Sequence, residues 1–133
     1  MQRFSMGEAA VTPQPEFTEE SFKLVINQTL AQNDSFPDLR QAVDSDGDFV
    51  VTDVYGSSTG AYSILFRNAG LRAMSSAEIT NANAVGTAQF PVPFGGVRYP
   101  AGGQISYSIT NKYAGSNVVQ IILSGIRLRK PGR

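Results

Sequence analysis

The stretch "QISYSIT", residues 104–110, decides the fold class because apolar and hydroxyl side chains alternate along it without a break. One parity is large and apolar and the other is small and polar: Ile105, Tyr107 and Ile109 against Ser106, Ser108 and Thr110. Successive side chains of a strand point to opposite faces of a sheet, so a period of two indicates a half-buried β-strand. We therefore expect a strand here, with the isoleucines and the tyrosine facing the core.

Three upstream stretches carry the same kind of signal. "SFKLVIN" (21–27) and "GAYSILFRN" (60–68) alternate, and "DFVVTDVYG" (48–56) is rich in β-branched residues, which strands favour. The residues expected to face the core are Phe22, Leu24 and Ile26 in the first stretch and Tyr62, Ile64 and Phe66 in the second. These stretches predict further strands of the same sheets.

Downstream, "NVVQIILSGIRLR" (117–129) predicts a strand whose apolar parity changes. Val119, Ile121 and Leu123 share one face, whereas Ile126 and Leu128 fall on the other. One extra residue at Ser124–Gly125 would bring both groups to the core side, so we expect a β-bulge there.

The remaining segments give weaker signals. "SSAEITNANAVGTAQF" (75–90) favours a short strand or loop over a helical turn or two, and "FPVPFGGVRYPAGG" (90–103) indicates loop because it holds three prolines and four glycines. About seven to nine strands remain, which is typical of an all-β, antiparallel sandwich. The long connections favour a jelly roll. We expect an extended N-terminal arm at 1–20, the sandwich at 21–130 and a tail at 131–133.

Composition excludes several kinds of chemistry. The 133 residues include no Cys and no His, so disulfides, thiol nucleophiles and Ser-His triads are excluded. The longest apolar runs are about five residues, far below the roughly 20 that span a bilayer, and the N-terminus has no apolar signal-peptide core. We expect synthesis in the cytoplasm and no membrane partner.

Charge is unevenly distributed although the formal net charge is zero. Residues 1–53 hold ten acidic and three basic side chains, whereas residues 54–133 hold eight basic and one acidic. Either the two halves let molecules meet head to tail, or antiparallel strands interleave them and cancel the field; we favour the second. Neutrality overall also argues against nucleic acid as a partner.

Carboxylates are the most suggestive candidates for a site. "DSDGDF" (44–49) places Asp44, Asp46 and Asp48 at alternate positions, but glycine is fourth and Tyr55 is twelfth, so an EF-hand is excluded. We expect a type I′ hairpin turn, with Gly47 at positive φ, rather than a metal site. Asp53 shares parity with apolar neighbours; we favour a strand end or an arginine pair over a catalytic acid.

Candidate contact residues for a protein partner come from three places. The arm contributes Phe4, Val11 and Phe17, the proline-rich segment contributes Phe90, Phe94 and Tyr99, and the C-terminus contributes Arg127, Arg129 and Lys130. The proline-rich aromatics form either an exposed apolar patch or a buried plug at one end of the sandwich, and we favour the plug. The basic end either meets an acidic partner or is solvated.

"RYPAGGQI" (98–105) and "VVQIILSGIRL" (118–128), with "LRQAVDSDGDFVVTDVYG" (39–56) and "GAYSILFRNAG" (60–70), resemble a group of small tailed-bacteriophage virion proteins over about residues 22–130. The group is similar to the cement, or decoration, proteins of phage heads. The resemblance implies a jelly roll, self-association as dimers or trimers, and binding to the major capsid protein on the outside of the virion. It implies no catalysis and no cofactor, and we expect no small-molecule substrate. The N-terminal arm lies outside the similar region.

Two other functions stay open at this point. A receptor- or carbohydrate-binding sandwich of a phage head or tail fibre would use exposed aromatic platforms, for which the lack of Trp leaves only residues such as Tyr55, Tyr62 or Tyr113. An enzyme that relies on carboxylates alone ranks last. We therefore expect a structural protein of the virion and not an enzyme.

Overall fold

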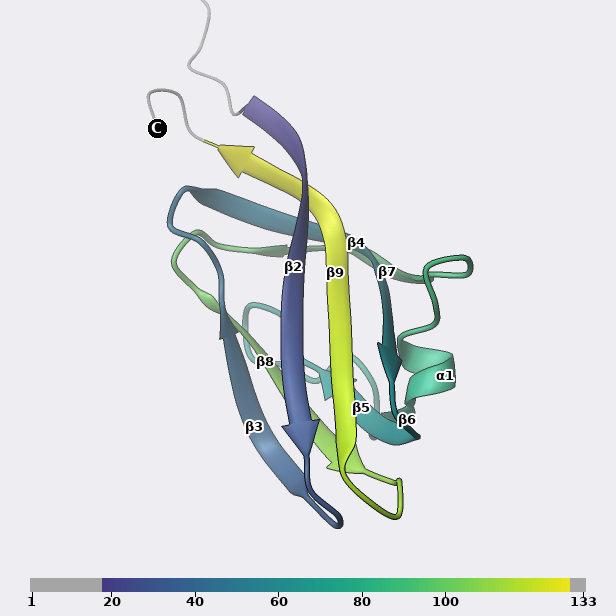
Figure 1. Ribbon diagram of the computed structural model, residues 1–133. Helices are drawn as coiled ribbons and strands as arrows, with labels where there is room; N and C mark the ends of the chain where they lie inside the picture. The colour runs from purple at the N-terminus through teal and green to yellow at the C-terminus, as the bar shows by residue number, and fades with distance from the viewer. Residues whose placement is uncertain (1–17, 130–133) are drawn as a thin grey trace, which may run out of the picture.

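A computed structural model describes residues 18–129, which form two antiparallel four-stranded sheets packed face to face (Figure 1). The strands are β2 (Thr18–Leu30), β3 (Ser35–Ala42), β4 (Gly47–Ser58), β5 (Tyr62–Phe66), β6 (Ile79–Thr80), β7 (Val92–Tyr99), β8 (Gln104–Asn111) and β9 (Asn117–Arg129), with one helical turn, α1 (Asn81–Ala84). Within this part of the chain, no helix is long and apolar enough to cross a membrane.

The strand order is that of a jelly roll. One sheet runs β2-β9-β4-β7 and the other runs β3-β8-β5-β6. Consecutive strands alternate between the sheets except for β5 and β6, which pair with each other, and early strands lie beside late ones. The expected antiparallel β-sandwich is confirmed. β2 begins at Thr18, inside the segment expected to be an arm.

The core lies between the sheets and contains the residues that the alternation placed inward. Ile105, Tyr107 and Ile109 of β8 are buried, as are Tyr62, Ile64 and Phe66 of β5. Ile26 of β2 is buried, while Phe22 and Leu24 pack against the same cluster. The outward-facing residues of β8 are less exposed than expected, because Ser106 is also buried. Other side chains cover that outer face, as described below.

The proline-rich segment forms β7, so the prediction of a loop was wrong there. β7 pairs only with β4 and is an edge strand, where proline is tolerated because no partner needs its missing N–H. Its pairing with β4 passes from Val97 directly to Pro93. Gly95 and Gly96, both at positive φ, lie in the interval and let the strand bulge.

The bulge predicted in the last strand lies instead in β4. β9 pairs with β2 without a break from Thr18–Arg129 to Leu30–Asn117, whereas its pairing with β4 passes from Val51 to Asp53 and leaves Thr52 as the extra residue. On one side of the bulge, Leu123 faces the core as expected. On the other side, Ile126 and Leu128 stay on the outer face of the sheet and are half-buried. The bulge was therefore predicted at the right level along the sheet but in the wrong one of the two paired strands.

Three glycines let the main chains of β4 and β9 approach closely. A Cβ on Gly125 would lie 1.9 Å from the carbonyl oxygen of Val50, and one on Gly56 would lie 2.2 Å from that of Gln120. A Cβ on Gly47 would lie 2.2 Å from the oxygen of Leu128. The prediction of positive φ at Gly47 was wrong, since the described residues with positive φ do not include it. Contact with β9 is what requires glycine there.

We expect Gly125→Ala to lower the free energy of unfolding by at least about 2 kcal/mol, because the strands must separate to admit the methyl group. Gly115→Ala is the matched control. Its Cβ would meet only the Tyr113 ring, at an ordinary 3.6 Å. Urea unfolding of both variants measures the difference. Equal stability of the two would contradict the close-contact account.

Candidate functional site

The C-terminal basic residues described by the structure are paired inside the chain. Arg127 donates from Nη2 to Oε1 of Glu20 (2.6 Å) and from Nη1 to Oδ2 of Asp44 (3.0 Å), and its side chain is only 16% exposed. Its guanidinium lies 4.1 Å from the centre of the Phe22 ring. Arg129 Nε lies 3.9 Å from the same Glu20 oxygen. Their charge stabilises one end of the sandwich and is already matched.

The "DSDGDF" segment joins strands of different sheets, so the hairpin prediction was wrong although a turn does occur at Ser45–Asp46. The carboxylates of this segment bind different partners. Asp44 pairs with Arg127, while Asp48 pairs with Arg98 at 2.7 Å and accepts a hydrogen bond from the Ala101 amide. Among residues 18–129, no group of three acidic side chains is arranged to hold a metal ion.

These ion pairs also show how the acidic first half and the basic second half of the sequence lie in the fold. Glu20, Asp44 and Asp48 belong to the acidic half, and their partners Arg98 and Arg127 belong to the basic half. The prediction that antiparallel strands interleave the two halves is confirmed for these pairs. At these pairs, acidic residues of the first half of the sequence and basic residues of the second half neutralise each other locally.

Asp53 lies on the outer face, not on the core face. The bulge at Thr52 reverses the parity of β4, so Val54 is buried in place of Asp53. The Asp53 carboxylate accepts a hydrogen bond from the Thr52 hydroxyl at 3.1 Å. The apolar surroundings that would favour an acid catalyst are absent from this position.

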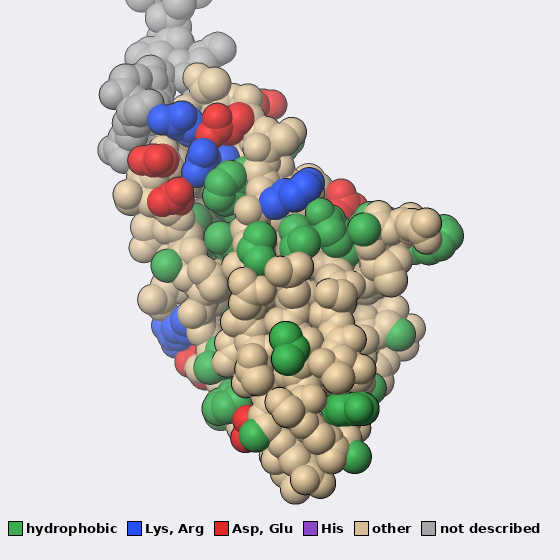
Figure 2. Space-filling view, in the orientation of Figure 1, with side chains coloured by type: hydrophobic (Ala, Val, Ile, Leu, Met, Phe, Trp, Pro, Cys, Tyr) green, Lys and Arg blue, Asp and Glu red, His purple; other side chains and the backbone are tan. Residues whose placement is uncertain are grey.

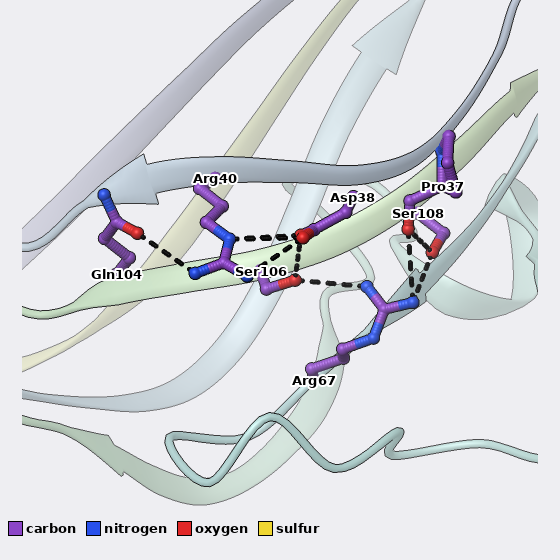
Figure 3. A network of polar contacts seen from close by, with 7 residues as sticks. All are labelled: Pro37, Asp38, Arg40, Arg67, Gln104, Ser106 and Ser108. Carbon is purple, nitrogen blue, oxygen red and sulfur yellow. Dashed lines mark hydrogen bonds and ion pairs between the residues drawn. The ribbon is translucent and has the colours of Figure 1, made fainter.

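A polar network covers the outer face of the second sheet, where Arg67 reaches from the end of β5 across β8 to β3 (Figure 3). Arg67 donates to the hydroxyls of Ser106 (3.1 Å) and Ser108 (2.7 Å) and to the carbonyl of Pro37 (3.2 Å). Asp38 accepts from Ser106 (2.6 Å) and pairs with Arg40 (2.9 Å). The network fixes the bulge in β3 between Phe36 and Leu39 onto β8 and explains why the serines are buried.

Hydrogen bonds from Arg40 and then from Ser106 lower the pKa of Asp38 from 3.8 to about 2. The folded state therefore prefers the ionised form. The contribution of this group to stability is complete above pH 3.8 and is lost as the pH falls toward 2.

We expect the stability advantage of the wild type over Asp38→Asn to shrink as the pH falls from about 4 to about 2. Thermal melts across that range, with Asp46→Asn as the control, measure it. Carboxyl NMR titration of Asp38 checks the cause, and Ser106→Ala should raise its pKa. An Asp38 carboxyl that titrates near 3.8 in the wild type would refute the network.

The aromatic candidates do not form one patch. Phe94 and Tyr99 are buried, and the Tyr99 hydroxyl donates to the carbonyl of Arg67 at 2.6 Å, whereas Phe90 is 77% exposed. The expected burial is thus confirmed for two of the three, although both lie on the strand β7 and not in a loop. Phe4, Val11, Phe17 and Lys130 lie outside the described residues.

A broad uncharged surface lies on the outer face of the β2-β9-β4-β7 sheet, where no described element covers β2 and β9 (Figure 1). Pairing aligns Val25, Ile122 and Tyr55 in an apolar row across three strands, and the next row is Asn27, Gln120 and Ser57. Figure 2 shows most of the charged side chains of this view gathered toward the upper end, with a few along the left margin and polar and apolar groups over the rest. We call the region of these two rows, together with Thr29 and Val118, the uncharged face.

Sequence reasoning missed the uncharged face because it asked which residues point inward. The signal was present: after Lys23, the outward positions of β2 are Val25, Asn27 and Thr29, and those of β9 before Ser124 are Val118, Gln120 and Ile122. Only the pairing of β2 with β9 and of β9 with β4 shows that they form one surface.

Comparison of the chain with protein-family models, with curated proteins and with solved structures gives no match.

Proposed function

We propose that this chain is a structural protein of a bacteriophage virion, which binds the outside of the head and stabilises the major capsid protein shell. The observation that carries the proposal is the uncharged face, which occupies one side of a jelly roll. Val25 is 42% exposed and Val118 is 60% exposed, so large apolar groups are presented to solvent. Such a surface suits contact with another protein.

The distribution of charge supports the same function. The row Lys23, Ser124 and Asp53 borders the uncharged face on the side of the charged end, where Arg98 and Arg127 are ion-paired within the chain. The ammonium of Lys23 lies 6.0 Å from the centre of the Tyr55 ring, at the margin of the face. A contact surface with few charged groups needs little removal of water from such groups when it binds, which lowers the cost of docking. Many copies on one shell add avidity to an interface of modest strength.

We expect Val25→Glu to weaken binding to phage heads that lack the chain by at least about tenfold, because binding would bury an unpaired carboxylate. Leu71→Glu is the matched control. Leu71 is 51% exposed and lies beside Asp38 and Arg67, on the outside of the other sheet. Cosedimentation with heads measures binding, and head melting measures the gain in shell stability.

Equal binding by the two variants would exclude the uncharged face as the docking surface. Failure of the wild-type chain to bind heads or to raise their melting temperature would contradict the proposed function itself.

Glycan binding by a head or tail fibre is the second candidate, and one observation favours it. The exposed Phe90 ring borders a hollow of about 500 Å³ whose lining includes Ser57, Asn81 and Thr87. An aromatic ring beside hydroxyl and amide groups resembles the composition of a sugar site. Glycan-array binding without affinity for heads would favour this function over the first.

A further inference from the structure

Phe90 is held outward by the fold rather than left loose. Its amide donates to the Thr87 carbonyl (3.0 Å) and lies 3.2 Å from the Thr87 hydroxyl, and the Thr87 amide donates back to the Phe90 carbonyl (3.2 Å). Gly86 takes a positive φ, and a β-bridge pairs it with Pro91 to close the base of this turn. At 77% exposure, Phe90 is the most exposed large hydrophobic residue among those described. A fixed turn lowers the entropy cost of burying its ring against a partner.

An apolar hollow lies nearby and is lined in part by the last two residues of α1. It measures about 250 Å³, and its lining includes Ile64, Phe66 and Phe94, with Met74 and Ile79 exposed at its margin. The rings of Phe66 and Phe94 meet edge to face at 5.1 Å. A phenyl ring fits such a space, since a dry apolar cavity of roughly 150 Å³ is enough to hold benzene.

The ring and the hollow of one molecule face different spaces. Phe90 lines the hollow formed with Asn81 and Ala82, whereas the apolar hollow is lined by Asn83 and Ala84, on the next residues of α1. The turn at Gly86–Pro91 fixes the ring in the first position. Phe90 of the same molecule therefore does not line the apolar hollow, and its ring is presented outward to a partner.

The surrounding segment suits contact between identical surfaces. Residues 79–97 contain no Asp, Glu, Lys or Arg, although the half of the chain to which they belong is strongly basic. A two-fold interface places like residues close together, so an uncharged segment avoids repulsion between copies. The segment forms β6, α1 and β7, which lie together at one edge of the sandwich (Figure 1).

We propose that two copies of this chain associate about a two-fold axis through this edge, each inserting Phe90 into the apolar hollow of the other. The partner is thus a second copy, and the interface consists of two identical ring-and-hollow contacts. The inference deepens the proposed function and rests on it for the place of the dimer on a shell. The interface itself is tested in solution, without heads.

The first test is sedimentation velocity of the full chain and its Phe90→Ala variant over a range of concentrations. We expect a wild-type dimer and a dissociation constant raised at least about 30-fold in the variant, as for loss of a buried aromatic anchor. Tyr113→Ala is the control, since Tyr113 is 43% exposed and lies in the loop between β8 and β9. It should dimerise like the wild type. Melting temperatures at low concentration should agree among all three.

The second test blocks the hollow instead of removing the ring. Met74→Lys keeps a long apolar stem at the margin but places an ammonium group over the opening, and it should weaken dimerisation as much as Phe90→Ala. Mixing the two variants should partly restore association, because the intact ring of one still fits the intact hollow of the other. A mixture that associates no better than either variant alone would overturn the ring-and-hollow contact.

Three other outcomes would also overturn the inference: a wild-type chain that is monomeric at every concentration, a wild-type trimer, or a Phe90→Ala variant that dimerises normally. A Phe90 variant that dimerises normally but loses binding to heads would assign the ring to the capsid partner instead. Dimerisation and head binding are measured separately, so failure of one leaves the other standing.

Discussion

The close contact between the main chains of β4 and β9 is the constraint on which the rest of the structure depends. β9 is central in its sheet, and Gly47, Gly56 and Gly125 remove the side chains that would hold β4 away from it. Near Gly125, the extra residue Thr52 interrupts the pairing, and both strands change direction at about that level (Figure 1). A bulge bends a strand and raises its twist. The sheet covers the core on both sides of the bend, since Phe49 lies above it and Leu123 below it, and the part above the bend also carries the charged end.

The sequence predicted the elements whose alternation is regular, and failed where geometry depends on a neighbouring strand. β5 and β8 were predicted with their inward residues because each alternates by itself. The bulge was assigned to β9 because a parity change does not reveal which of two paired strands has the extra residue, and the same bulge placed Asp53 outward. β7 was missed because proline and glycine mark loops, yet an edge strand tolerates both. The burial of Ser106 depends on Arg67, 39 residues away.

The surface divides into regions that suit different kinds of contact. At the charged end, Arg127 and Arg98 form ion pairs with carboxylates of the same chain. The hydrogen bonds of Arg67 cover the outer side of the second sheet. The uncharged face presents Val25 and Val118 to solvent, and the edge of the sandwich presents Phe90, Met74 and Ile79. A jelly roll that lies with its face on a shell and its edge against a copy would use both. This division is why we favour a structural role in a virion over a role in catalysis.

The most direct measurement is a cryo-electron microscopy difference map between virions with the chain and virions without it. The account predicts added density of jelly-roll shape on the outside of the head, with the β2-β9-β4-β7 sheet toward the major capsid protein. Added density confined to the tail, or the absence of any difference on the head, would contradict it.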